Sequence, residues 1–153
     1  MRRTQESVAS ALALCASIVL GACHQEFEAP DRAARVARAD ALFATAAFDT
    51  VEWSADSARV SEGNLVYTEE CRRCHGTLGG GTTDYARERD LEVPSLVERG
   101  WPLAQVDSLR RKIYIGHESG MPIFGDADLS LRQIDAAAAY ILLTLRPEVL
   151  EEG

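Results

Sequence analysis

Apolar residues recur at helical spacing in three separate stretches of the chain. The first stretch covers residues 55–72, the second runs from Pro102 until Gly116 stops it, and the third covers residues 130–146. Within each stretch, apolar positions three or four residues apart fall on one face of a helix. These positions are Val60, Gly63, Val66 and Tyr67, then Leu103, Val106, Leu109 and Ile113, and finally Ile134, Ala137, Ile141 and Leu145. The pattern predicts three packed helices.

Residues that favour helix ends mark the first and third helices. Ser54 or Asp56 is suited to cap the first helix, because their side-chain oxygens accept hydrogen bonds from free backbone N–H groups. Ser130 and Gln133 have the spacing of a capping box at the start of the third helix. Pro147 is expected to end that helix, because proline has no backbone N–H to donate.

Gly63 lies in the interior of the first predicted helix. Glycine there costs about 1 kcal/mol relative to alanine, so its presence calls for a structural reason. Close approach of a second helix supplies one, and the third helix is the natural partner because it is rich in alanine. Tyr140 is expected to join this contact.

The stretch from Gln25 to Thr50 is rich in alanine, arginine and aspartate. A short helix is predicted from Asp31 to Phe43, since alanine and arginine favour helices. Its apolar residues are mostly alanine, which leaves it little to bury. The segment is therefore interpreted as a spacer, with a docking helix for a partner subunit, carried by Leu42, Phe43 and Phe48, as the alternative.

The N-terminus has the layout of a secretory signal. Arg2 and Arg3 precede an apolar run from Val8 to Ala22. The run spans about 15 residues, which is short of the roughly 20 that cross a membrane. The signal predicts export from the cytoplasm.

The signal ends in Leu20-Gly21-Ala22-Cys23, which resembles the lipobox of bacterial lipoproteins. The resemblance implies cleavage before Cys23 and lipidation of its thiol, whereas a plain signal peptide would leave that thiol free. Several acyl chains would anchor the protein firmly on the periplasmic side of a membrane, and His24 in place of aspartate favours the outer membrane. The predicted parts are a signal peptide over 1–22, a lipidated tether over 23–53 and a folded domain over 54–150.

Composition narrows the choice of partner. The 153-residue chain is 46% apolar and 26% charged and carries a formal net charge of −8. Nucleic acid is excluded as a partner, because the chain has no excess of basic residues to neutralise phosphates. The acidic charge favours a protein partner with a basic docking surface.

The chemistry of the chain centres on Cys71-Arg72-Arg73-Cys74-His75. Two cysteines three positions apart, with a histidine directly after, are typical of c-type haem attachment. On a helical turn the two thiols can form thioethers to one porphyrin, and His75 can ligate its iron. The alternatives are a thioredoxin-like redox pair, half of a zinc site, and chance.

Met121 is the candidate for the second axial ligand. It lies in Gly120-Met121-Pro122, where proline fixes the adjacent backbone, and the only other methionine is the initiator. A thioether is a soft, neutral ligand suited to haem iron. His117 is the rival ligand, and Trp101 is expected to form a wall of the haem crevice.

Residues 54–147 together resemble a class I cytochrome c domain. The resemblance depends on Cys71–His75, on Gly63 and Tyr67 before it, and on Pro94-Ser95-Leu96, Gly120-Met121-Pro122 and Ala139-Tyr140-Ile141 after it. It implies an all-α fold of three to five helices around one covalently attached haem c. It further implies axial ligation of the iron by His75 and Met121, with the Pro94 carbonyl accepting the other N–H of His75.

The resemblance implies a single-electron carrier, not an enzyme, that exchanges electrons with donor and acceptor proteins. Two alternatives stay open: a haem peroxidase or gas sensor with a labile distal ligand, and a subunit fixed in a respiratory or dehydrogenase complex.

Overall fold

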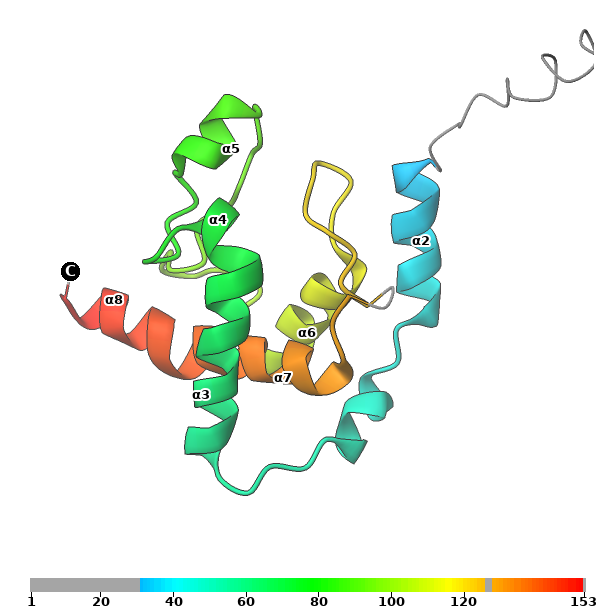
Figure 1. The fold of residues 1–153 in the computed structure, drawn as a ribbon, viewed down its shortest axis with the longest axis vertical. Coiled ribbons are helices and arrows are strands. Elements are labelled where there is room, and N and C mark those ends of the chain that lie inside the picture. The colour runs from blue at the N-terminus through cyan, green and yellow to red at the C-terminus, as the bar shows by residue number, and fades with distance from the viewer. Residues whose placement is uncertain (1–30, 126–127, 153) are drawn as a thin grey trace, which may run out of the picture. The chain divides into compact units, whose positions relative to one another are not determined.

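Two long helical segments cross near Gly63, and the other elements pack around this crossing. In the computed structural model, the first segment joins α3 (Asp56–Val66), the π-turn η2 (Tyr67–Cys71) and α4 (Arg72–His75). The second segment joins α7 (Leu131–Tyr140), the π-turn η3 (Ile141–Leu145) and α8 (Arg146–Glu152). Figure 1 shows α3 crossing in front of the second segment.

The structure describes residues 31–125 and 128–152, and this part of the chain contains helices and loops but no strand. The all-α prediction is confirmed. The remaining helices are α2 (Arg32–Leu42), the 3-10 helix η1 (Thr45–Thr50), α5 (Asp84–Glu88) and α6 (Val106–Ile115). The predicted signal peptide and Cys23 lie outside the described residues. No helix within the described ranges is long and apolar enough to cross a membrane.

The helices cross at Gly63 because the two backbones approach closely there, as the sequence predicted. A Cβ added to Gly63 would collide with the backbone carbonyl of Ala136 on α7. The alanines of α7 at positions 136–139 are buried, and the rings of Tyr67 and Tyr140 pack with centroids 5.4 Å apart. The two backbones therefore touch where side chains are smallest.

Three predicted helix ends are wrong. Helix α3 begins after Ala55 without a side-chain cap, so neither Ser54 nor Asp56 caps it. Helix α6 begins at Val106, because the residues after Trp101 form a turn in which Ala104 N–H donates to the Trp101 carbonyl at 3.2 Å.

The third wrong helix end is that of the C-terminal segment, which continues through Pro147 to Glu152. The π-turn η3 ends at Leu145, two residues before this proline, and Arg146 N–H donates to the carbonyl of Ile141. A proline ring normally collides with the carbonyl four residues earlier. The carbonyl four residues before Pro147 belongs to Leu143, which lies inside the wider π-turn, and the helix continues past the proline. The predicted capping box at Ser130 and Gln133 is confirmed.

Helix α2 forms at the predicted place, with Asp31 as its cap, but it is not a free spacer. Ala39 is buried in a cluster with Ile115 and Ile123, and Phe48, in η1, is buried in the main core. The described residues from Asp31 onward belong to one compact unit. The few large apolar residues of the segment predicted as a tether thus find partners within the chain.

A buried carboxylate joins four parts of the fold. Asp135 on α7 is 1% exposed and accepts hydrogen bonds from Trp53 at 2.7 Å, from Arg59 at 2.6 Å and from Arg110. Burial alone would raise the pKa of Asp135, but these donors outweigh it and hold the pKa below its usual range. The network fastens the segment before α3, α3 itself and α6 to α7.

We expect Gly63→Ala to lower the free energy of unfolding by about 2 kcal/mol, because the added methyl group overpacks the crossing. Thermal unfolding followed by circular dichroism measures the change. Gly80→Ala is the matched control, since a Cβ there would meet nothing within 4 Å. Equal stability of the two variants would contradict the close approach.

Asp135→Asn should destabilise the protein by about 3 kcal/mol at neutral pH, because two arginines lose their buried partner. A carboxylate whose pKa is lowered by folding stabilises the fold above its unfolded pKa of about 3.9. That stabilisation disappears as the pH falls through the folded pKa, so wild type and variant should converge in acid. Denaturant unfolding over a pH series measures this, with Asp40→Asn as the control because its ion pair with Arg111 is exposed.

Candidate haem site

One cavity of about 480 Å³ brings together the residues that the motifs singled out. Cys71, Cys74, His75, Pro94 and Met121 all line it, although they come from three separate parts of the sequence. The remaining lining is mainly apolar, and it includes Leu96, Trp101, Leu109, Ile113, Phe124 and Ile141. A mostly apolar cavity with a few convergent polar groups is the usual form of a cofactor site.

Hydrogen bonds hold the Cys71–His75 turn in place. The turn begins at Cys71, the last residue of η2, so the first long segment delivers both cysteines to the cavity. Gly81 N–H donates to the His75 carbonyl at 2.9 Å, and the Tyr67 hydroxyl donates to the Gly76 carbonyl at 2.6 Å. Tyr67 is 1% exposed and thus serves the core, as the sequence predicted. Contacts within the protein therefore hold the Cys71–His75 turn.

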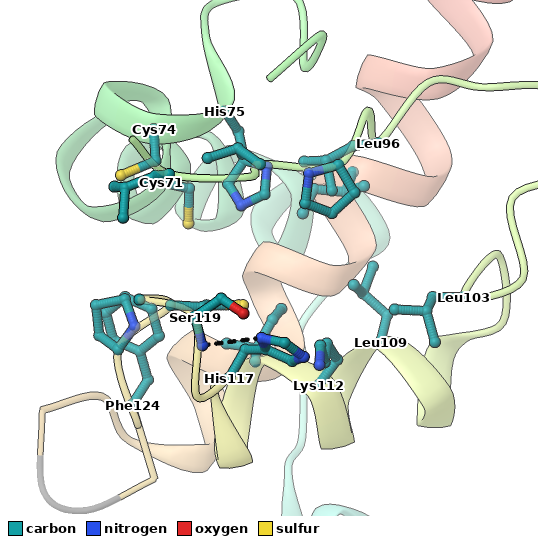
Figure 2. A pocket seen from close by; sticks show the side chains of 18 of the residues that line it. Cys71, Cys74, His75, Leu96, Leu103, Leu109, Lys112, His117, Ser119 and Phe124 are labelled. Atoms are coloured by element: carbon teal, nitrogen blue, oxygen red, sulfur yellow. Dashed lines mark hydrogen bonds between the residues drawn. The ribbon is translucent and has the colours of Figure 1, made fainter. Parts of the chain in front are cut away.

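His75 projects into the cavity from the same wall as Cys71 and Cys74 (Figure 2). Burial lowers the pKa of His75, and the nearby backbone carbonyl of Pro94 raises it by less. The ring is therefore neutral at physiological pH, which is the form that ligates metals. Its Nδ1 is buried without a hydrogen-bond partner, a costly state that a bound cofactor would relieve by fixing the ring against Pro94.

The loop after α6 forms the opposite wall, and Figure 2 shows His117 and Ser119 facing His75 across the cavity. His117 N–H donates to the Met121 carbonyl at 3.1 Å and closes the loop. Gly116 has a φ of +68°, and a Cβ there would collide with the carbonyls of Met121 and Pro122. Met121 is half-buried, whereas His117 is exposed and its Nδ1 accepts the Ser119 N–H at 3.1 Å. Both residues line the cavity on the side opposite His75, and Met121 is the more buried of the two.

The other interpretations of the cysteine motif fit this site poorly. Burial and then the charge of Glu70 raise the pKa of Cys71 to about 12, whereas redox pairs depend on a lowered cysteine pKa. Within the described ranges, no three His, Cys, Asp or Glu side chains converge as a zinc site requires. Paired thiols, an inward-facing imidazole and an apolar cavity suit a haem.

Comparison with known proteins agrees with this geometry. Residues 58–141 match the protein family described as cytochrome c oxidase, cbb3-type, subunit III. The chain belongs to this family. No curated protein and no solved structure matches it.

Family membership confirms the prediction of a class I cytochrome c domain and establishes haem-based electron transfer as its general function. The matched residues include the Cys71–His75 turn, Met121 and the crossing of α3 with α7. Helix α2, η1 and α8 lie outside the match.

Lys112 is a cavity residue that sequence analysis missed. It is the only lysine in the sequence, and it lines the cytochrome c cavity beside His117 (Figure 2). Burial lowers the pKa of Lys112, and the neighbouring Arg111 lowers it further. A half-buried cation in an apolar wall suits a haem carboxylate. The one feature of the sequence that sets this residue apart is that it is the only lysine.

Arg146 was also missed, although it supports the proximal wall. It is 8% exposed, donates to the backbone carbonyls of Leu96 and Glu98, and lies 5.1 Å from the centroid of the Trp101 ring. Trp101 itself is a buried wall of the cavity, as predicted. The segment containing Pro94 is thereby fastened to the end of the C-terminal segment.

Proposed function

We propose that this cytochrome c domain is a single-electron carrier with one haem c, bound covalently by Cys71 and Cys74 and ligated by His75 and Met121. The observation that carries the proposal is their common cavity, in which His75 lies opposite the loop that holds Met121. Both axial positions would be filled, so no substrate would reach the iron. The protein would exchange electrons with donor and acceptor proteins, not act as an enzyme.

The bound haem would supply one-electron chemistry between ferric and ferrous iron. The residues of this chain prepare the site for it. Burial keeps His75 neutral and therefore able to ligate, and Lys112 offers a cation for a haem carboxylate. The apolar lining excludes water and so disfavours the more highly charged ferric state, which raises the reduction potential. Cys74 is half-exposed, which makes its edge of the site the natural port for electrons.

The same proposal places the protein on the periplasmic side of a bacterial membrane, anchored through lipidated Cys23, with the outer membrane favoured. The signal pattern and the Leu20–Cys23 sequence support this. The net charge of −8 supports a redox partner with a basic docking surface.

A second candidate function is that of a cytochrome c subunit fixed in a respiratory complex. The family description, which names an oxidase subunit, favours it. Stable co-purification of a partner in mild detergent distinguishes a fixed subunit from a free carrier.

Met121→Ala in the haem-loaded full chain should open the distal side of the iron. We expect loss of the methionine-to-iron charge-transfer band, rapid CO binding by the ferrous protein, and a lower reduction potential. His117→Gln is the matched control and should leave all three unchanged. If His117→Gln produces these changes instead, the distal assignment is wrong, and rapid CO binding by the wild type would favour a peroxidase or gas sensor.

Cys23→Ser should move the protein from the membrane fraction to the soluble periplasmic fraction, because the acyl chains lose their attachment point. Fractionation followed by haem staining measures this. Cys15→Ser is the matched control, since it changes a cysteine within the predicted signal and should leave the protein on the membrane. Retention of the Cys23 variant on the membrane would contradict lipidation.

A further inference from the structure

We propose that Arg32 is a positioning residue for Met121, and that α2 braces the distal ligand loop from outside the haem cavity. The inference rests on the proposed ligation of haem iron by Met121. It concerns a part of the chain that precedes the residues shared with the family, which begin at position 58.

The Arg32 side chain binds both ends of the ligand loop at once. Its Nε donates to the His117 carbonyl at 3.1 Å, and its Nη2 donates to the Met121 carbonyl at 2.5 Å. These two residues are already joined by the hydrogen bond that closes the loop. The planar, charged guanidinium fork suits two neighbouring acceptors, and charge-assisted hydrogen bonds are stronger than neutral ones.

Helix α2 packs against the two chain segments that lead into and out of this loop. Ala39 packs with Ile115, directly before Gly116, and with Ile123, directly after Pro122. Asp40 forms an ion pair with Arg111 on α6. Figure 1 shows α2 lying beside the loop that follows α6. Arg32 therefore acts from a helix whose position is set by the roots of the loop that it holds.

The loop needs such a brace because it has little regular structure of its own. Residues 117–120 are exposed and belong to no helix. Pro122 has no N–H to offer, and Gly116 and Gly120 both have positive φ values. The brace matters because the position of a ligating group depends on the residues that hold it. Two hydrogen bonds on the carbonyls of His117 and Met121 restrain the backbone from which the thioether extends.

The test compares Arg32→Gln with Arg38→Gln in the haem-loaded full chain. Both substitutions remove one arginine from α2, but Arg38 is an exposed residue of that helix. We expect Arg32→Gln to weaken the methionine-to-iron charge-transfer band and to raise the fraction of iron open to CO by roughly tenfold, the size expected for a lost charge-assisted hydrogen bond. Arg38→Gln should match the wild type in both measurements.

The same substitution in the Met121→Ala background separates positioning from general destabilisation. If Arg32 acts through Met121, Arg32→Gln adds nothing to the CO binding of a protein that already lacks the ligand. An equal increase in both backgrounds, or identical behaviour of Arg32→Gln and Arg38→Gln, overturns the inference. Arg32→Lys, which keeps the charge but not the fork, replaces Arg32→Gln if the latter fails to assemble, and it should weaken the band in the same direction.

The Met121→Ala spectrum also keeps this inference distinct from the proposed function. If Met121→Ala loses the band but Arg32→Gln has no effect, the positioning role of Arg32 is contradicted and the proposed ligation by Met121 is supported. If Met121→Ala leaves the band unchanged, the proposed ligation by Met121 is contradicted.

Discussion

The backbone contact between Gly63 on α3 and Ala136 on α7 sets the geometry on which the site depends. The segment that contains Gly63 continues into Cys71, Cys74 and His75, so its position fixes the proximal wall of the cavity. The segment that contains Ala136 continues to Ile141 in the cavity lining. A side chain larger than hydrogen at position 63 would force the two segments apart, and residues of both segments line the cavity. One small residue therefore affects both the packing of the two segments and the cavity that they help to line.

Charge is distributed differently inside the protein from outside it. The surface carries an excess of acidic groups, yet the buried and half-buried charged residues near the site are mostly cations with defined acceptors. Arg146 donates to backbone carbonyls behind the proximal wall, Arg32 donates to backbone carbonyls behind the distal loop, and Arg110 donates to Asp135 beneath them. Arginine suits these positions because its fork binds several oxygens and stays charged when desolvated. Lys112, by contrast, lines the cavity itself.

The sequence predicted those features that are encoded locally. The capping box at Ser130 and the Cys71–His75 turn are each defined by a few neighbouring residues, and each lies where expected. Gly63 could be predicted although its partner Ala136 is distant, because a glycine inside a helix is itself a signal of close approach. Helix α2 could be predicted as a helix but not as a packed one, because its partners Ile115 and Ile123 lie more than 70 positions away. The helix end predicted at Pro147 was wrong because the helix continues past this proline after the π-turn η3, which no pattern in the sequence predicted. Arg32, Lys112 and Arg146 belong to no motif, and their roles appear only once the chain is folded.

The two walls of the cavity differ in how they are held, and this difference explains the need for an external brace. The proximal wall is the end of a continuous helical segment, pinned by hydrogen bonds from Tyr67 and Gly81. The distal wall is a loop with exposed residues. A ligand on a helix keeps its place because its backbone is already ordered, whereas a ligand on a loop has to be ordered by contacts from elsewhere. Under the proposed ligation by Met121, the reduction potential would thus depend on Arg32, which precedes the residues that match the family.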